Sequence, residues 1–403
     1  MKSLKFLMIA LVAMLGFISC DKDDCNHYDH SADLVGTWTC LQENFAEALV
    51  ISADGSMVAT GLADGKYWED VKGTITLKDG KAILNFEDNV TVEGHFDIIP
   101  GMAFSIVTDN GERMTFNYCA NDLSEEIVGM WVYNDVKEAM RIHTFDNNGS
   151  ATFTGWSEYL GEFSVLENSN YRVVGDLVFQ GFSNEEDSFT KYIAAKLIYA
   201  PNGTAHGDIM TFKSYSSDGT ESVQSWLRIK QSLDLTGTTY DYISAYVSNA
   251  KGKDEDFTML GHTFNMANIN AGNFDMMFRS ELFCVDLNTN TITQHFLPAN
   301  GQDVAIEIPI TVEGNKVTLD LSTENPAYRK VDMYMFQDAD NSQLHMYMHT
   351  NDFINYFANM ELYNLLAAGE IDKTDAAAIE KVYTDMEARI ESINVSLVLK
   401  ARN

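Results

Sequence analysis

The strongest indication of the fold is the stretch Leu34-Val35-Gly36-Thr37-Trp38 (LVGTW). A similar stretch, Ile127-Val128-Gly129-Met130-Trp131 (IVGMW), occurs further along the chain. A degenerate third copy, LTGTTY, runs from Leu235 to Tyr240. One Gly-x-Trp is a weak signal. Two copies with the same aliphatic-Val prefix, each opening a β-rich stretch, indicate an internal repeat. The 403 residues are long for one core and sufficient for two or three domains.

The first two copies continue as short apolar runs separated by turn residues. Asp54-Gly55 and Asp79-Gly80 punctuate the first copy, and Asp146-Asn147-Asn148-Gly149 punctuates the second. Asp-Gly between apolar runs is a strong hairpin signal. A meander of about eight strands buries one face of each strand and removes its edges by closing into a barrel. We therefore expect a mostly β chain of tandem antiparallel up-and-down β-barrels.

The third copy is longer and ends differently. Asn351 to Ala368 has the apolar spacing of a helix, and Gly369 is a stop signal. A second helix is predicted from Asp372 to Asp375 onward, and the alternating run SINVSLVL predicts a closing strand. The predicted domains are 34–122, 123–232 and 233–403, the last with two C-terminal helices before its final strand.

A Gly-x-Trp at the start of the first strand, followed by an up-and-down plan, resembles the lipocalin (calycin) superfamily. The resemblance implies that Trp38 and Trp131 plug the closed ends of their barrels, while Tyr240 stands at that place in the third copy. As a whole, the chain resembles the multi-domain lipocalin-like surface lipoproteins of Bacteroidetes. That family implies no established activity.

The N-terminus has the features of an export signal. Lys2 and Lys5 precede Phe6 to Ile18, an uncharged run that is too short to span a bilayer comfortably. Phe17-Ile18-Ser19-Cys20 resembles a lipobox, in which the cysteine becomes the lipid-modified N-terminus. We expect residues 1–19 to be a lipoprotein signal peptide and Cys20 to be the membrane anchor. The alternative is an ordinary signal with an incidental cysteine.

Residues 20–33 are predicted to form an acidic tether. Asp21, Lys22, Asp23 and Asp24 follow the anchor, and anionic lipid repels such an acidic patch. These residues resemble the export signal of surface lipoproteins in Bacteroidetes. The resemblance implies a protein anchored in the outer membrane and facing the cell exterior. A plain solvated tether is the alternative.

The charge of the chain limits its partners. Acidic residues number 59 against 27 basic residues, for a formal net charge of −32. Such a surface repels nucleic acid, so we expect no nucleic-acid partner. Neutral sugars, cations or a basic protein partner remain compatible with it.

Two of the five cysteines fall on strands that meet when the first barrel closes. Cys40 follows the first Gly-x-Trp, and Cys119 ends the last predicted strand of that domain. We expect the two to lie close together, as a disulfide or as two buried thiols, because an export compartment permits a disulfide. No cysteine spacing resembles a zinc site, and we expect neither a metal nor a cofactor.

No catalytic motif is present. The sequence lacks Gly-x-Ser-x-Gly, His-Glu-x-x-His and a phosphate loop, so we expect a protein that is not an enzyme. A hydrolase without a recognisable motif is one alternative. A structural or protein-interaction scaffold with filled barrels is the other.

Aromatic residues in the third domain predict a ligand site. Tyr240, Tyr242 and Tyr246 recur with the period of a strand face, and Tyr347 and His349 form a similar face. Aromatic rings with polar tips suit glycans and small amphipathic molecules. We expect these five residues to line a cavity for such a ligand, with the helices covering part of the outer wall. Interdomain packing or plain barrel lining is the alternative.

Overall fold

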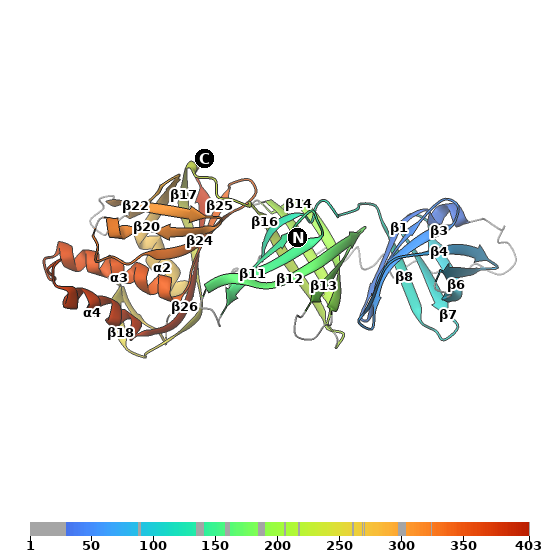
Figure 1. Cartoon of the computed structure of the whole chain (residues 1–403), viewed down its shortest axis with the longest axis horizontal. Coiled ribbons are helices and arrows are strands. Elements are labelled where there is room, and N and C mark those ends of the chain that lie inside the picture. Colours follow the sequence, from blue (N-terminus) through green and yellow to red (C-terminus); the bar gives the residue numbers. More distant parts are fainter. Residues whose placement is uncertain are drawn as a thin grey trace, which may run out of the picture. The chain divides into compact units, whose positions relative to one another are not determined.

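The computed structural model describes residues 30–87, 90–133, 141–157, 162–183, 190–204, 207–216, 218–259, 262–267, 269, 271–296, 304–323 and 325–402. The signal peptide, Cys20 and the charged residues Asp21 to Asp24 lie outside them. The described strands form three closed eight-stranded antiparallel barrels and one two-stranded sheet (Figure 1). The predicted mostly β fold with tandem up-and-down barrels is confirmed.

The first barrel holds β1 to β8 in sequence order. A 3-10 helix, η1 (His30–Leu34), precedes it. Its strands are Gly36–Gln42, Phe45–Ile51, Ser56–Ala63, Lys66–Lys78, Lys81–Phe86, Thr91–Ile99, Ala103–Thr108 and Arg113–Cys119.

Trp38 is fully buried in the first barrel, and its Nε1 donates a hydrogen bond to the Leu34 carbonyl at 2.7 Å. Phe104 and Tyr118 pack edge-on against the Trp38 ring. Gly36 has a φ of +135°, and a Cβ on it would lie 2.7 Å from the Tyr118 ring. Only glycine therefore suits this position.

The second barrel repeats this local geometry. Trp131 is fully buried, its Nε1 donates to the Ile127 carbonyl at 2.7 Å, and Gly129 has a φ of +133°. Arg228 covers the Trp131 ring at 4.3 Å. The strands β9 to β16 are Gly129–Tyr133, Arg141–Phe145, Ser150–Ser157, Glu162–Val174, Leu177–Ser183, Thr190–Thr204, Gly207–Tyr215 and Glu221–Ile229.

The third barrel closes in the order β17-β20-β21-β22-β23-β24-β25-β26. These strands are Thr236–Gly252, Leu282–Asn288, Thr291–Phe296, Val304–Glu313, Lys316–Leu319, Val331–Gln337, Gln343–Met348 and Ile390–Ala401. A 3-10 helix, η2 (Leu321–Thr323), follows β23. A separate hairpin of β18 (Asp256–Met259) and β19 (His262–Asn265) follows β17, and helix α2 (Ala271–Glu281) precedes β20.

The two predicted C-terminal helices are present as α3 (Thr350–Ala367) and α4 (Ala376–Glu387), directly before β26. Gly369, with a φ of +72°, ends α3 as its sequence signal predicted. The side chain of Asp375 caps α4 by accepting from the Ala378 amide at 3.0 Å.

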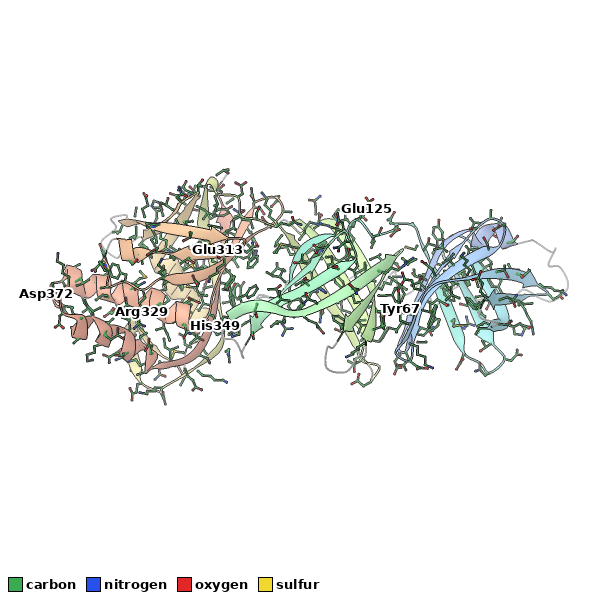
Figure 2. The ribbon with its side chains drawn as sticks, in the orientation of Figure 1. Tyr67, Glu125, Glu313, Arg329, His349 and Asp372 are labelled. Carbon is green, nitrogen blue, oxygen red and sulfur yellow. The ribbon has the colours of Figure 1, made fainter. Side chains whose placement is uncertain are left out.

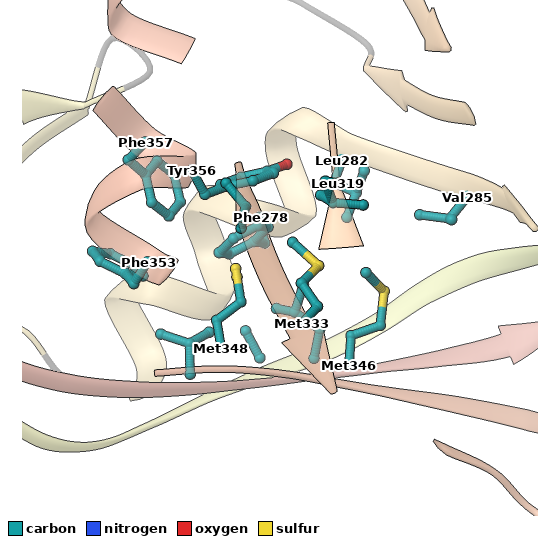
Figure 3. Packing of buried hydrophobic residues seen from close by; sticks show 14 of the residues in the cluster. Phe278, Leu282, Val285, Leu319, Met333, Met346, Met348, Phe353, Tyr356 and Phe357 are labelled. Carbon is teal, nitrogen blue, oxygen red and sulfur yellow. The ribbon is translucent and has the colours of Figure 1, made fainter. Parts of the chain in front are cut away.

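Side chains from strands and helices form one buried cluster in the third barrel. Met333, Met346 and Met348 from its strands join Phe278 of α2 and Phe353 of α3 in one buried cluster (Figure 3). Tyr356 of α3 is also buried there, and its hydroxyl donates to Gln294 Oε1 at 2.8 Å. Side chains of α2 and α3 therefore pack with the interior side chains of the strands, whereas we expected the C-terminal helices on the outer wall.

The buried part of the second barrel contains a polar pair. Gln180 Nε2 lies 3.1 Å from His143 Nε2, and Phe145, Phe153 and Trp226 surround the imidazole. Burial lowers the pKa of His143 to about 4, so the ring is neutral at pH 7 and accepts from the amide.

Cys40 and Cys119 are thiols in the structure and do not form the disulfide that was one of the two expectations. Cys40 is buried in β1, and the Cys119 thiol donates to the Asn121 carbonyl at 3.0 Å. Burial raises the pKa of the Cys119 thiol, which favours its protonated form.

Candidate functional site

A groove of about 720 Å³ opens at the surface of the third barrel, between β22, the segment after β23 and the turn that joins α3 to α4. Figure 2 marks Asp372 at this turn. The volume lies in the range of about 300–1,000 Å³ that is usual for ligand sites. The apolar lining is Ala305, Ile306, Leu321, Tyr328, Tyr363, Leu366, Ala367 and Ile371. The polar lining is Glu307, Asn325, Asp372 and Lys373.

The floor of the groove rests on the packing between α3 and α4. Tyr328, Leu366 and Ile371 pack against the buried cluster that Ala358, Leu362, Ile379 and Tyr383 form. Because the floor is continuous with a packed core, we expect it to keep its shape without a ligand.

Polar contacts fix the segment that carries Tyr328. The side-chain oxygen of Asn325 accepts from the Ala327 amide at 3.0 Å, and the Asn325 carbonyl accepts from the Tyr328 amide at 3.0 Å. The next residue, Arg329, donates to Glu380 and Glu387 of α4 at 2.9 and 2.8 Å. This segment is therefore tied both to its own turn and to a helix.

Two tyrosines give the groove its chemical character. Tyr363 is 52% exposed and lines the groove, so a ligand can contact it there. Burial, together with the nearby Tyr363, raises the pKa of Tyr328, which keeps its hydroxyl protonated at neutral pH. Rings that pack and hydroxyls that donate suit a ligand with both apolar faces and polar groups.

The structure divides the five predicted ligand residues between two faces. The pairing of β17 with β26 shifts between Tyr242 and Ser244, which is a β-bulge. Tyr240, before the bulge, is buried in the interior cluster and accepts from Gln337 Nε2 at 2.8 Å. Tyr242 packs at the edge of the same cluster, and its hydroxyl donates to Asp275 Oδ1 at 2.7 Å.

Beyond the bulge the alternation is reversed, so Ala245 faces the interior and Tyr246 faces outward. Tyr246 and Tyr347 both pair with Ser396 of β26, on the outer face. Tyr347 packs in a cluster with side chains of the second barrel, which belongs to the same compact unit.

His349 stacks on Trp156 of β11, and burial lowers its pKa to about 4. The expectation of one shared face is therefore wrong, because one extra residue in β17 exchanges its two faces. Of the five, Tyr242 lines a pocket, together with Asp241, Arg279, Leu282 and Arg402.

The sequence carried one overlooked signal for the groove. Tyr363 lies in the predicted helix but outside its apolar stripe of Phe353, Ile354, Phe357, Met360 and Leu365. A large aromatic residue on the polar side of a helix could have been singled out. Tyr328 lies in an irregular segment, where no periodicity marks it.

Among the described residues, no three His, Cys, Asp or Glu side chains come together as a metal site. No helix in the described part of the chain is long and apolar enough to cross a membrane.

No family model matches the chain, and no curated protein matches it. Similar solved structures include the vaccine antigen transferrin-binding protein B of Haemophilus parasuis Hp5 in a double-mutant form. It has 9% identity and a TM-score of 0.24, over 89% of this chain and 65% of that one. The isotype 1 protein of that name from serogroup B Neisseria meningitidis has 7% identity and a TM-score of 0.21, over 89% and 66%. A likeness at this level carries no argument about what this chain binds.

Proposed function

We propose that this chain is a non-catalytic, lipid-anchored binding protein of the cell surface. Its third barrel takes a neutral glycan, or a small amphipathic molecule of similar character, in the groove between β22 and the α3–α4 turn. The observation that carries the proposal is the pairing of Tyr363 and Tyr328 with polar groups in one open groove.

The packing of the barrel supports a site at its surface. In the third barrel, side chains of strands and helices share one buried cluster, and the groove gives a ligand room at the surface. The sugar face of a glycan would pack on the Tyr363 ring. Its hydroxyls would bond the groups of Asn325 and Asp372. The net charge of −32 disfavours an anionic ligand.

The N-terminal residues support the location. A short apolar run that ends at Cys20 supports lipid anchoring, and Asp21, Lys22, Asp23 and Asp24 support display on the outer face of the outer membrane. The proposed domain limits remain 34–122, 123–232 and 233–403.

A glycan array probed with the mature chain, from Asp21 onward, tests the proposal. We expect binding to one group of neutral glycans. We expect Tyr363→Ala to weaken that binding by about five- to tenfold, because a packed aromatic ring contributes on the order of 1 kcal/mol. Met102→Ala removes a similarly exposed side chain, 57% exposed in the native chain, and should leave binding unchanged. Binding that survives Tyr363→Ala would place the ligand elsewhere.

The second candidate is a protein-interaction scaffold, which the large buried clusters of the second and third barrels favour. In that case the array shows no specific glycan, and crosslinking on intact cells joins the chain to one neighbouring surface protein. A partner whose crosslinks fall on the second barrel or on the outer strands of the third would support this candidate over the groove.

A further inference from the structure

A second pocket of the third barrel, separate from the groove, is built from charged groups. It has a volume of about 390 Å³ and is lined by Asp241, Tyr242, Arg279, Leu282 and Arg402. These residues come from β17, from α2, from the start of β20 and from the chain end after β26. Two guanidinium groups in one small pocket stand out in a chain with 27 basic and 59 acidic residues.

Arg279 is held in place before any ligand arrives. Its Nε and Nη2 donate to Asp275 at 3.3 and 3.1 Å, and Nη2 also donates to the Ile243 carbonyl at 2.7 Å. Within the described residues, these bonds leave the N–H groups of Nη1 for another acceptor. The side chain is 59% exposed, and the ring of Tyr242 lies 5.7 Å from the guanidinium. A planar donor pair fixed in this way suits a carboxylate.

Asp275 orients the two residues on this side of the pocket, Arg279 and Tyr242. Besides Arg279, it accepts from the Tyr242 hydroxyl at 2.7 Å and from the Ala245 amide at 2.9 Å. These donors lower the pKa of Asp275 although its burial acts in the other direction. With its lone pairs engaged, Asp275 holds the Tyr242 ring and Arg279 in one arrangement.

Asp241 and Arg402, which also line the pocket, form an exposed ion pair. Arg402 donates to Asp241 through Nε, at 3.0 Å, and through Nη2. The Asp241 and Arg402 side chains are both close to half exposed. An exposed pair of this kind is worth little on its own, so a ligand can share the Asp241 carboxylate at small cost.

Asp241 and Asp275 balance the charges of Arg279 and Arg402, and Asp286 also interacts electrostatically with Arg402, so the pocket has no excess positive charge. A free anion would approach a chain of net charge −32 and meet no excess positive charge. A zwitterion adds no net charge, and it can bond both the Arg279 guanidinium and the Asp241 carboxylate. Leu282 and the Tyr242 ring supply an apolar surface in the pocket.

We propose that this pocket binds a small zwitterion, of which an α-amino acid with an apolar side chain is the simplest form. Its carboxylate bonds Nη1 of Arg279, and its ammonium bonds Asp241. The side chain packs on Tyr242 and Leu282. This site does not depend on the glycan groove, because the two pockets share no lining residue.

Calorimetric titration of the mature chain at pH 7 tests the proposal with three matched probes. L-leucine carries both charges, 4-methylpentanoate lacks the ammonium, and 3-methylbutylamine lacks the carboxylate. We expect leucine to bind, and each singly charged analogue to bind at least tenfold more weakly. Equal binding of 4-methylpentanoate would make the pocket a plain anion site and overturn the proposal, as would the absence of leucine binding at millimolar concentration.

Two variants separate binding from folding. Arg279→Lys keeps the charge but loses the planar donor pair, and we expect leucine affinity to fall at least tenfold. Asp241→Asn should weaken leucine binding and strengthen 4-methylpentanoate binding, because it removes a negative charge that attracts the ammonium and repels the carboxylate. A general loss of structure cannot produce these opposite signs. Arg113→Lys and Asp97→Asn alter a comparably exposed pair of the first barrel and should change neither affinity. Should Asp241→Asn weaken both probes equally, the assignment of the ammonium is wrong.

Discussion

At the scale of single residues, two tryptophans and two glycines set the start of the first two barrels. Trp38 and Trp131 each donate to the carbonyl four residues earlier at 2.7 Å, and Gly36 and Gly129 have φ values of +135° and +133°. A residue with a side chain is strained at these angles. The Gly-x-Trp repeat is thus a requirement of local geometry as well as of packing.

Another residue, Glu47 in β2, makes the first barrel sensitive to pH. Its side chain is 7% exposed, Trp68 donates a hydrogen bond to it, and burial raises its pKa to about 8. Between pH 4.5 and pH 8 the folded state therefore binds more protons than the unfolded state. Stability falls as the pH rises through this range.

We predict that Glu47→Gln stabilises the first barrel at pH 7 by on the order of 3 kcal/mol, since each pKa unit is worth about 1.4 kcal/mol. The glutamine oxygen still accepts from Trp68, and it carries no charge. Hydrogen exchange of β2 and β4, compared with the native chain at pH 5 and pH 8, measures the effect. The gain should be larger at pH 8. Glu93→Gln, at an exposed site, is the control, and an equal gain from it would contradict the prediction.

At the scale of elements, helix α2 completes strand β17. The bulge beyond Tyr242 takes backbone groups out of the strand ladder. Asp275 accepts from the Ala245 amide at 2.9 Å, and Arg279 donates to the Ile243 carbonyl at 2.7 Å. The helix thus supplies partners for the bulge, and the same contacts build one wall of the small pocket.

We predict that Asp275→Ala destabilises the third barrel by about 2–3 kcal/mol, because it leaves the Ala245 amide and the Tyr242 hydroxyl without their acceptor. Thermal unfolding, with hydrogen exchange to locate the change in β17 and α2, measures the loss. Asp385→Ala removes an exposed carboxylate that pairs with Lys381 in α4, and it should have little effect on stability. Similar losses in the two variants would rule out the special role of Asp275.

At the scale of the whole molecule, the proposed anchor and export signal would set where the proposed binding sites act. We predict that Cys20→Ala moves the protein from the membrane fraction to the soluble fraction, because the acylated cysteine is the proposed anchor. Replacing Asp21, Asp23 and Asp24 by Asn should leave the protein in the membrane fraction but protect it from protease added to intact cells. Membrane retention of Cys20→Ala would refute the anchor. Unchanged digestion of the triple variant would refute the export signal.

The barrels and the two C-terminal helices could be predicted from the sequence. Each of these follows from local signals: Gly-x-Trp prefixes, Asp-Gly turns, strand alternation and the Gly369 stop. The sequence did not reveal helix α2, whose run from Ala271 to Glu281 is short and carries a glycine near its start. Tertiary contacts with β17 stabilise that helix.

The faces that point inward and the positions of the pockets depend on tertiary contacts, so they could not be predicted from the sequence. Period-two spacing placed Tyr240, Tyr242 and Tyr246 together, and one bulge residue then exchanged the faces of β17. The groove unites β22 with the turn after α3, and the small pocket unites β17, α2 and the chain end. Spacing along a chain records the local periodicity of one element. Contacts between distant elements depend on how barrels close and helices pack, and no local pattern encodes them.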